Sequence, residues 1–571
     1  MPGSIDSGAG FERGAVLAVA LTVGVGAAWK PLDGDVRTAT WNEAIETLRD
    51  LEKEVGPRWL WWSGETARTF VANGIRPARC WDLEVVYRLL AGGWRAGPGR
   101  VWADANGLDA DTIPERSPVD LFHQPTGEDD RPVRADGHLD PEWVAGKRAD
   151  TIERLAVWVD LALRVHSMQA DRLGNEPAHA ATARSESAAG VLCAELETDG
   201  LPIDRPAAET VISSYIGPRP TDARHAEQLE LERDHLVLRH APAGSDFDLR
   251  NPGQVKSLLR RVGVEVPDTR ASRLEGELKA HPIVPALLTW RKAERIATTF
   301  GYGWLDEHVG PDGRLRGSWA GSDGAAGRMT ATAGLHNMPA DLRPAIIAGT
   351  DHVFVRADLG QIEPRVLAAV SGDEALARAS RDNDMYQPVA ERLRVEREIA
   401  KVAVLGAMYG QTTGKGAEAL AGLERGYPVA MGYLRAAAES AQGGHDLRTY
   451  GGRCVRMSGS IDPGSSDRDG RTRAAARGRY GRNAMVQGAA AELFKTWAVI
   501  VRARTESLGA RIVLCLHDEL LVHTPAAVGD RTAAAVDDAL EEAASRWAPP
   551  RHPAVRFVAD TSVIERWSDA K

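Results

Sequence analysis

The most constraining feature of the chain is a pair of apolar runs that meet at a charged centre. Residues 512–516 (IVLCL) and 520–522 (LLV) are typical of buried β-strands, and only the three residues His517, Asp518 and Glu519 separate them. This spacing predicts a hairpin, although an ordinary turn would carry a pair such as Asn-Gly. Partial burial of two adjacent carboxylates is unfavourable unless a cation neutralises them. The segment therefore predicts either a divalent-metal site or an exposed hairpin tip.

A further carboxylate, Asp358, stands at the end of another apolar run. Residues 353–357 (VFVRA) precede it, and residues 362–370 have a helical pattern that tolerates Pro364 in the first turn. A strand-end carboxylate is well placed to bind a metal, although a helix-capping aspartate is the commoner explanation of such a residue. If Asp358 and Asp518 belong to one sheet, they could hold two divalent ions about 3.5 to 4 Å apart, as in-line phosphoryl transfer requires.

A third segment, residues 396–414, predicts a helix that ends at Gly410. Arg397, Lys401 and Leu405 follow one another at four-residue steps, and Tyr409 comes one step later on the same slowly rotating face. Two cations and an aromatic ring suit a nucleoside triphosphate, because the cations bind phosphates and the ring lies beside the base. An ordinary solvated helix face would also carry an Arg/Lys pair.

Together and in this order, the three segments resemble the motifs of family A DNA polymerases, the family of bacterial DNA polymerase I. Residues 358–365 (DLGQIEPR) resemble its first palm motif, residues 397–410 its fingers-helix motif and residues 517–519 its second palm motif. Further similar segments, in family order, are 281–300 (thumb helix), 327–339 (GRMTATAGLHNMP) and 483–495 (NAMVQGAAAELFK). The resemblance covers about residues 190 to 571.

The resemblance implies catalytic and metal-binding roles. Asp358 and Asp518 would be catalytic carboxylates that bind two Mg²⁺ ions, for which Mn²⁺ could substitute, and Glu519 would be an auxiliary metal ligand. Lys401 would be a third catalytic residue, which protonates the leaving pyrophosphate. Glu363 would exclude a ribose 2′-hydroxyl.

The resemblance also implies two sets of binding residues. The incoming nucleotide would be bound by Gln361, Glu363, Arg397, Lys401, Leu405 and Tyr409. The primer-template duplex would be bound by Arg328, Arg479, Asn483, Gln487 and His517. Arg328 and Gln487 would contact the minor groove, whose acceptors are nearly alike for all correct base pairs.

Three residues depart from the family pattern. Leu359 and Gly360 replace the usual Tyr-Ser, and Leu405 stands where the family has an aromatic residue beside the sugar. We therefore expect altered sugar discrimination, with more dideoxynucleotide incorporation in a Leu405→Tyr variant.

The implied fold is α/β and α+β multidomain, with an RNase H-like, exonuclease-type N-terminal domain and a right-hand polymerase domain that has an antiparallel palm sheet. We expect these domains at residues 1–185 and 186–571. The second divides into a thumb (about 186–305), a palm (about 306–371 and 500–571) and fingers (about 372–499). We expect no 5′-nuclease domain within these 571 residues.

The N-terminal domain is predicted to be a degenerate 3′–5′ exonuclease with a structural role. That chemistry needs two metals held by acids, but the first apolar run, residues 14–28, has none. We interpret this run as one buried strand, since its leader lacks the positive start of a signal peptide. Asp82 resembles the second exonuclease aspartate, but Asp160 lacks the tyrosine four residues earlier. The Asp82-x-Glu84 pair is better explained as a capped helix start.

Composition adds weaker constraints. The net charge of −10 requires any nucleic-acid contact to use a local basic surface, and residues 448–482 have the strongest basic excess. Residues 104–142 are acidic and predict a solvated loop, and residues 174–190 predict a domain boundary. Four widely spaced cysteines predict no disulfide framework and favour a reducing compartment. We expect a cytoplasmic, nucleoid-associated monomer that does not bind membranes.

The predicted function is DNA-templated addition of deoxynucleoside monophosphates to a primer 3′-hydroxyl, with release of pyrophosphate. The partners would be primer-template DNA and deoxynucleoside triphosphates. Two alternatives stay open: a template-dependent RNA polymerase on the same palm, which Glu363 disfavours, and a non-catalytic DNA-binding relative. The sequence does not distinguish replication, repair and lesion bypass.

Overall fold

The computed structural model describes residues 11–116, 130–174, 176–243, 247–410, 416–457, 467–548 and 554–570. The chain forms two compact units, which we describe separately. The first comprises residues 1–199, 318–330 and 351–563, and the second comprises residues 200–317, 331–350 and 564–571. Parts of the predicted acidic loop (117–129), fingers motif (411–414) and basic loop (458–466) lie outside the described residues.

The N-terminal part of the first unit is built on a five-stranded sheet with the order β3-β2-β1-β4-β5. Strands β1, β2 and β3 are antiparallel neighbours, whereas β4 is parallel to β1 and β5 is parallel to β4. The strands are β1 (Val16–Thr22), β2 (Gly26–Pro31), β3 (Arg37–Thr40), β4 (Arg58–Trp61) and β5 (Arg79–Asp82). The prediction of one strand over residues 14–28 was wrong. The chain reverses between β1 and β2, where Gly24 has a φ of 80° that a residue with a side chain rarely adopts.

Helices cover both faces of this sheet. Successive strand residues point to opposite faces, so Leu17 and Val19 belong to one apolar core whereas Ala18 and Ala20 belong to another. The helices are α1 (Trp41–Glu54), α2 (Gly64–Ala72), α3 (Leu83–Ala91), α4 (Pro98–Ala105), α5 (Pro141–Ala145) and α6 (Ile152–Leu173). The predicted helices 41–55, 66–73 and 150–173 are confirmed to within two residues at each end.

Helix α7 (Pro177–Asp199) replaces the domain boundary that we predicted over residues 174–190. Its small residues are buried rather than solvated, so this prediction was wrong, and the expected domain border at residue 185 falls inside the helix. The buried Glu186 forms ion pairs with Arg453 (2.6 Å) and with Lys495. Lys495 also donates to the backbone carbonyls of Gly327 (2.7 Å) and Gly321 (3.2 Å).

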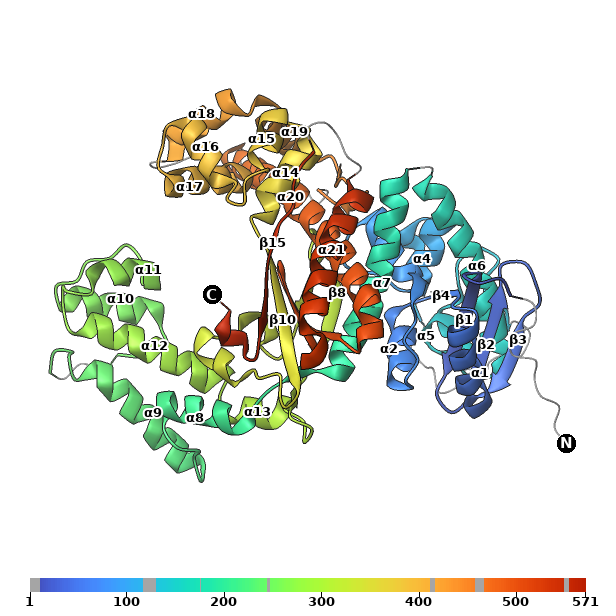
Figure 1. Cartoon of the computed structure of the whole chain (residues 1–571), viewed down its shortest axis with the longest axis horizontal. Helices are drawn as coiled ribbons and strands as arrows, with labels where there is room; N and C mark the ends of the chain where they lie inside the picture. The colour runs from blue at the N-terminus through green and yellow to red at the C-terminus, as the bar shows by residue number, and fades with distance from the viewer. Residues whose placement is uncertain are drawn as a thin grey trace. The chain divides into compact units, whose positions relative to one another are not determined.

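A second, four-stranded sheet has the order β13-β14-β10-β15. In Figure 1 the yellow strand β10 lies beside the red β15, although the two are far apart in sequence. The strands are β10 (His352–Leu359), β13 (Arg511–Leu516), β14 (Glu519–Pro525) and β15 (Ala559–Ile564). Strands β13 and β14 form the predicted hairpin, and β10 is antiparallel to β14.

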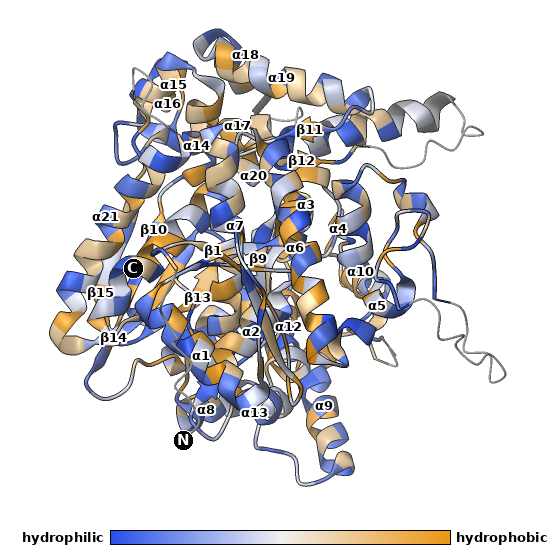
Figure 2. Cartoon of the chain, turned by 90° about the vertical axis from the view of Figure 1, so that its right-hand side faces the viewer, coloured by the Kyte–Doolittle hydropathy of each residue, from blue (hydrophilic) through white to orange (hydrophobic). Residues whose placement is uncertain are grey.

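Two long helices pack with this sheet. Helix α20 (Asp467–Thr505) contacts both α7 and α21 (Gly529–Trp547). Bands of orange and blue alternate along α21 in Figure 2, and its apolar residues Val536, Leu540, Ala543 and Trp547 are buried. Because that spacing of three or four residues lies on one side of a helix, α21 presents an apolar face to the core.

A helical layer follows β10 in the chain, over the predicted fingers. Its elements are α14 (Ile362–Ser371), α15 (Glu374–Ala379), α16 (Tyr386–Leu393), α17 (Arg397–Tyr409), α18 (Gly416–Gly426), α19 (Pro428–Gln442), β11 (Leu447–Arg448) and β12 (Cys454–Val455). Residues from α14 to α19 share one apolar core. The hairpin of β8 (Trp319–Asp323) and β9 (Arg328–Ala331) forms a separate two-stranded sheet.

The second unit is mainly helical, as predicted for residues up to about 305. Leu258, Leu287 and Trp290 are in its apolar core. Its elements are β6 (Leu201–Pro202), α8 (Arg205–Ile216), α9 (Ala223–Leu238), α10 (Pro252–Arg261), α11 (Ala271–Leu274), α12 (Ile283–Thr299), α13 (Tyr302–His308) and β7 (Arg314–Leu315).

The structure also bears on the cysteines and on membrane spans. All four cysteines are buried thiols, in agreement with the prediction of no disulfide framework.

Among the described residues, one helix, Thr472–Leu508, is long and apolar enough to cross a membrane, but 89% of its most apolar 18-residue stretch is buried inside the protein. Such burial is the pattern of a core helix.

Candidate active site

The strand-end carboxylates come together where β10 meets the β13–β14 hairpin. Asp358 lies directly opposite Glu519 in the strand register, and the backbone N–H of Leu359 donates to the carbonyl of Asp518 (2.9 Å). His517 and Asp518 form the two-residue connection, in which His517 has a left-handed φ of 53°. The structure thus brings the two predicted catalytic aspartates onto neighbouring strand ends.

The electrostatics of these carboxylates reflect their crowding. Burial, followed by repulsion from Asp518, raises the pKa of Asp358 to about 6, although the Arg356 guanidinium opposes this shift. Burial also raises the pKa of Asp518, and Glu519 adds to that effect. A positive ligand would relieve both the desolvation and the repulsion.

A cavity of about 250 Å³ lies next to Asp518. It is lined by Arg328, Gln361, Ile362, Glu363, Pro364, Tyr386, Leu405, Tyr409, Ala490, Ala491, His517 and Asp518. Seven of these are residues that we predicted to bind nucleotide, metal or DNA, although they come from four separate segments of the sequence. The cavity is therefore the candidate nucleotide site.

Glu363 connects several walls of the cavity. Its carboxylate accepts hydrogen bonds from Arg328 (2.7 Å) and from the Tyr409 hydroxyl (2.9 Å). The side chain of Glu363 is only 12% exposed, so these two donors satisfy a largely buried charge. Burial, followed by the charge of Glu363, raises the pKa of Tyr409, and Gln487 forms a hydrogen bond with the same tyrosine. The four side chains form one polar network.

Helix α17 presents the predicted cationic face. Arg397, Lys401, Leu405 and Tyr409 are all half-buried, whereas Ala400, Ala403, Val404, Ala407 and Met408 are buried. Gly410 ends the helix as predicted, with a φ of 71°. Leu405 and Tyr409 line the cavity, and Lys401 lies one turn before Leu405 on the same face.

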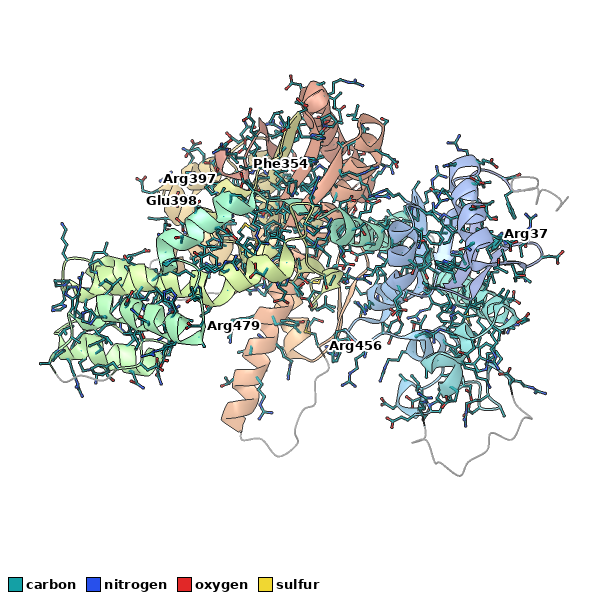
Figure 3. The ribbon with its side chains drawn as sticks, turned by 90° about the horizontal axis from the view of Figure 1, so that it is seen from below. Arg37, Phe354, Arg397, Glu398, Arg456 and Arg479 are labelled. Carbon is teal, nitrogen blue, oxygen red and sulfur yellow. The ribbon has the colours of Figure 1, made fainter. Side chains whose placement is uncertain are left out.

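Arg397 forms ion pairs within this layer. Its guanidinium contacts Asp384 and the neighbouring Glu398, and it lies 5.8 Å from the ring centre of Tyr386. Figure 3 labels Arg397 and Glu398 at the start of α17, and Arg479 on α20. Arg397 is still 39% exposed, so its cationic head is accessible to an anion.

Gln361 is held at the beginning of α14. It adopts a left-handed φ of 50°, and its side-chain oxygen accepts from the backbone N–H of Met385 (2.9 Å). The buried Arg365 donates to the same oxygen (3.4 Å). Gln361 therefore connects the start of α14 to the loop before α16. Tyr386 is the first residue of α16.

The predicted DNA-binding residues of α20 recur every four residues on one face of the helix. Arg479 is exposed, Asn483 and Gln487 are half-buried, and Ala491 lines the cavity at the next step. The side chain of Arg479 passes over Gly410: a Cβ added to Gly410 would lie 2.8 Å from the Cγ of Arg479.

His517, in the connection between β13 and β14, has a lowered pKa. Burial is the main cause, followed by repulsion from Arg328.

Sequence reasoning missed two residues of the site. Arg356 lies beside the carboxylates, with its guanidinium 2.6 Å from Asp358 and 3.3 Å from Glu519. The ring of Tyr386 lines the cavity, and its burial, together with the charge of Glu363, raises its pKa to about 12. Arg356 precedes Asp358 by two residues, so both side chains lie on the same face of the strand. This spacing could have identified Arg356 as a site residue from the sequence.

The carboxylates fit the partial ligand set of a magnesium ion. Within the described ranges, no three His, Cys, Asp or Glu residues are grouped so as to enclose a metal. Mg²⁺ commonly uses one or two protein carboxylates and completes its shell with water and substrate phosphates. Asp358 and Asp518 match that requirement, and Arg356 forms ion pairs with both Asp358 and Glu519.

The fold and site define a mixed α/β multidomain protein whose antiparallel sheet bears a carboxylate pair beside a cavity of about 250 Å³. Residues 224–569 match the sequence model of DNA polymerase family A, and the chain belongs to this family. It is therefore a member of a nucleotidyltransferase family, and of the branch similar to DNA polymerase I.

Individual relatives agree with this assignment. The chain is 30% identical over 397 residues to the thermostable DNA polymerase I of Thermus caldophilus, which covers 61% of this chain and 46% of that protein. It is 26% identical over 342 residues to DNA polymerase I of Deinococcus radiodurans, covering 53% and 35% of the two chains. The chain thus spans less than half the length of these relatives.

A solved structure shares the fold over almost the entire chain. It is described as the POL domain of Pol1 from M. smegmatis in complex with DNA primer-template and dNTP. The TM-score is 0.67 at 20% identity, and the match covers 98% of this chain and 96% of the other. This likeness confirms the mixed α/β multidomain fold class.

Proposed function

We propose that the protein is a DNA-templated DNA polymerase that adds deoxynucleoside monophosphates to a primer 3′-hydroxyl and releases pyrophosphate. The observation that carries the proposal is the meeting of Asp358 and Asp518 at adjacent strand ends beside the cavity. A non-catalytic DNA-binding relative would gain nothing from these acids, because unneutralised carboxylates weaken binding to a phosphate backbone.

Asp358 and Asp518 would hold two Mg²⁺ ions, or Mn²⁺ in their place, with Glu519 as an auxiliary ligand. Such ions, when bound, lower the pKa of the attacking hydroxyl and neutralise charge on the leaving group. The two aspartates orient the reacting groups in line. Lys401 holds a proton on its Nζ and passes it to the oxygen of the departing pyrophosphate.

The cavity residues would select the nucleotide. Arg397 and Lys401 attract the triphosphate from the exposed edge of α17, and Tyr409 lies beside the nascent base pair. Glu363 is fixed by Arg328 and Tyr409, so it can block a ribose 2′-hydroxyl without moving. Gln361 supports this wall from α14, and Leu405 provides an aliphatic surface next to the sugar.

The duplex would lie against the face of α20 and the β8–β9 hairpin. Arg479, Asn483 and Gln487 share one face of α20, and Arg328 and His517 border the cavity. Contacts of Arg328 and Gln487 with minor-groove acceptors would test base-pair geometry rather than sequence.

We further propose that residues 1–185 are an RNase H-like, degenerate exonuclease domain. Three antiparallel strands followed by two parallel strands, in the order β3-β2-β1-β4-β5, support the fold. The buried Asp82 caps α3 by accepting from the Val85 N–H (3.0 Å) and also accepts from Trp61, so it is engaged in structure. Asp160 pairs with Lys30 (2.7 Å). Residues 186–571 would form the thumb, palm and fingers of a monomeric, cytoplasmic, nucleoid-associated enzyme.

The test is extension of a labelled primer on a defined template, with wild type, Asp518→Ala and the exposed control Asp538→Ala. We expect Asp518→Ala to lose at least about a hundredfold in rate, whereas Asp538→Ala extends normally and all three proteins bind the duplex in fluorescence anisotropy. Undiminished extension by Asp518→Ala would refute the mechanism. Extension with ribonucleotides but not deoxynucleotides would favour an RNA polymerase.

A further inference from the structure

Arg356 is a cation placed within the carboxylate cluster by the sheet itself. It precedes Asp358 by two residues on β10, so both side chains lie on one face of the strand. Its Nη2 is 2.6 Å from Oδ2 of Asp358 and 3.3 Å from Oε2 of Glu519 on β14. Its Nη1 is 3.3 Å from Oδ2 of Asp560 on β15. One guanidinium therefore joins acids of three neighbouring strands.

The surroundings of Arg356 hold it in this position. The side chain is only 12% exposed, and that of Glu519 is only 8% exposed. Asp358 and Glu519 lie directly opposite each other, and like charges in that arrangement repel unless a cation intervenes. Since an arginine is always charged in a protein, Arg356 supplies this cation permanently.

A divalent ion would share the carboxylate of Asp358 with Arg356. The guanidinium donates to Oδ2 of Asp358, which leaves fewer lone pairs of this carboxylate for a metal. The positive charge of Arg356 also repels a cation that approaches Asp358 and Asp518. At the effective dielectric constant of a partly buried site, one unit charge a few ångströms away changes the affinity for a divalent ion at least about tenfold.

We propose that Arg356 is a resident counter-ion that keeps the affinity of the carboxylates for divalent cations low until a nucleotide arrives. A bound triphosphate adds phosphate oxygens and negative charge, which offset the charge of Arg356. Arg356 is a positioning residue, since it acts through Asp358 and Glu519. The inference rests on the proposed metal site, and it adds a coupling between metal binding and nucleotide binding.

The test is Mn²⁺ binding to the full chain without DNA or nucleotide, measured from the electron paramagnetic resonance signal of free Mn²⁺. The variants are Arg356→Gln, the charge-conserving Arg356→Lys and the control Arg504→Gln, whose arginine pairs with Glu542 away from the site. We expect Arg356→Gln to bind Mn²⁺ at least about tenfold more tightly than wild type. Arg356→Lys and Arg504→Gln should stay within about threefold of wild type, because the charge near the site is kept.

Two further measurements separate the possible failures. The gain in affinity should disappear in Arg356→Gln/Asp518→Asn and should shrink when a deoxynucleoside triphosphate is present. If Arg356→Gln leaves an Asp518-dependent affinity unchanged or weaker, the counter-ion inference is overturned while the proposed metal site stands. If Mn²⁺ binding does not depend on Asp518 in any variant, both are overturned. Arg356→Met is a second neutral variant for the case in which circular dichroism shows that Arg356→Gln does not fold.

Discussion

Replacing Lys495 by methionine tests how far the buried ion-pair cluster supports the first unit. Lys495 is fully buried and pairs with Glu186, which is itself 1% exposed and also pairs with Arg453. Methionine keeps most of the volume but removes the charge, so Glu186 retains only Arg453. The carbonyls of Gly327 and Gly321 lose their donor as well.

The expected cost follows from these contacts. Removing one partner of a buried ion pair typically costs about 3 to 5 kcal/mol when it leaves a charge uncompensated. In Lys495→Met, Glu186 keeps Arg453, so we expect a smaller cost of about 2 to 3 kcal/mol, mainly from the carbonyls that lose their donor. Glu186→Gln should cost about 3 to 5 kcal/mol, since it leaves two buried cations near one another. In Glu186→Gln/Lys495→Met, one charge of each sign is removed together, so the double variant should be more stable than the sum of the single effects by about 1 to 3 kcal/mol.

Urea unfolding followed by tryptophan fluorescence gives the overall effect, with the exposed Lys53→Met as the control. Because a protein of several domains need not unfold in one step, hydrogen exchange of residues 319–331 should report the local loss directly. Since Gly327 adjoins Arg328, Lys495→Met should also weaken primer-template binding. A Lys495→Met protein within about 1 kcal/mol of wild type, with unchanged exchange in that hairpin, would refute the reasoning.

Three other predictions concern single side chains. Burial raises the pKa of Asp82 to about 6, so the folded state binds more protons than the unfolded state between about pH 4 and 6. The free energy of unfolding should therefore fall by up to about 3 kcal/mol as the pH rises through that interval. The thermal midpoint of Asp82→Asn should vary less with pH than that of wild type. Equal pH dependence of the two midpoints contradicts this role of Asp82. Leu405→Tyr should increase the dideoxy/deoxy incorporation ratio in single-nucleotide extension, and an unchanged ratio disposes of the proposed role of Leu405. Glu363→Ala should raise the ribo/deoxy ratio at least about tenfold in the same assay, with an unaltered ratio counting against steric exclusion by Glu363.

The predictable parts of the fold were those in which local pattern and tertiary structure agree. The β13–β14 hairpin, the strand before Asp358 and the helix that ends at Gly410 all have strong apolar periodicity and clear end signals. The placement of Asp358 beside Asp518 depended on long-range strand pairing, which the sequence motifs predicted through resemblance and which the register now shows. The assigned roles of the site residues stay predictions.

The errors arose where small or polar residues have partners far away in the sequence. Residues 174–190 lack large apolar side chains, which suggested a boundary, but α7 uses its small residues to pack closely inside the first unit. The burial of Glu186 depends on Arg453 and Lys495, and nothing in the local sequence indicates those partners. Arg356 was missed although its position two residues before Asp358 put both on one strand face; its other partners, Glu519 and Asp560, follow much later in the chain. The turn between β1 and β2 was missed because its glycine lies within a continuous apolar run.

The strand order β13-β14-β10-β15 has a consequence for co-translational folding. Strand β10 is synthesised long before its two neighbours, β14 and β15. Until both have emerged, its backbone edges lack their hydrogen-bonding partners and expose an aggregation-prone surface. Productive folding of this sheet is therefore a late event in translation, and a stalled nascent chain that ends within α20 cannot contain the paired aspartates.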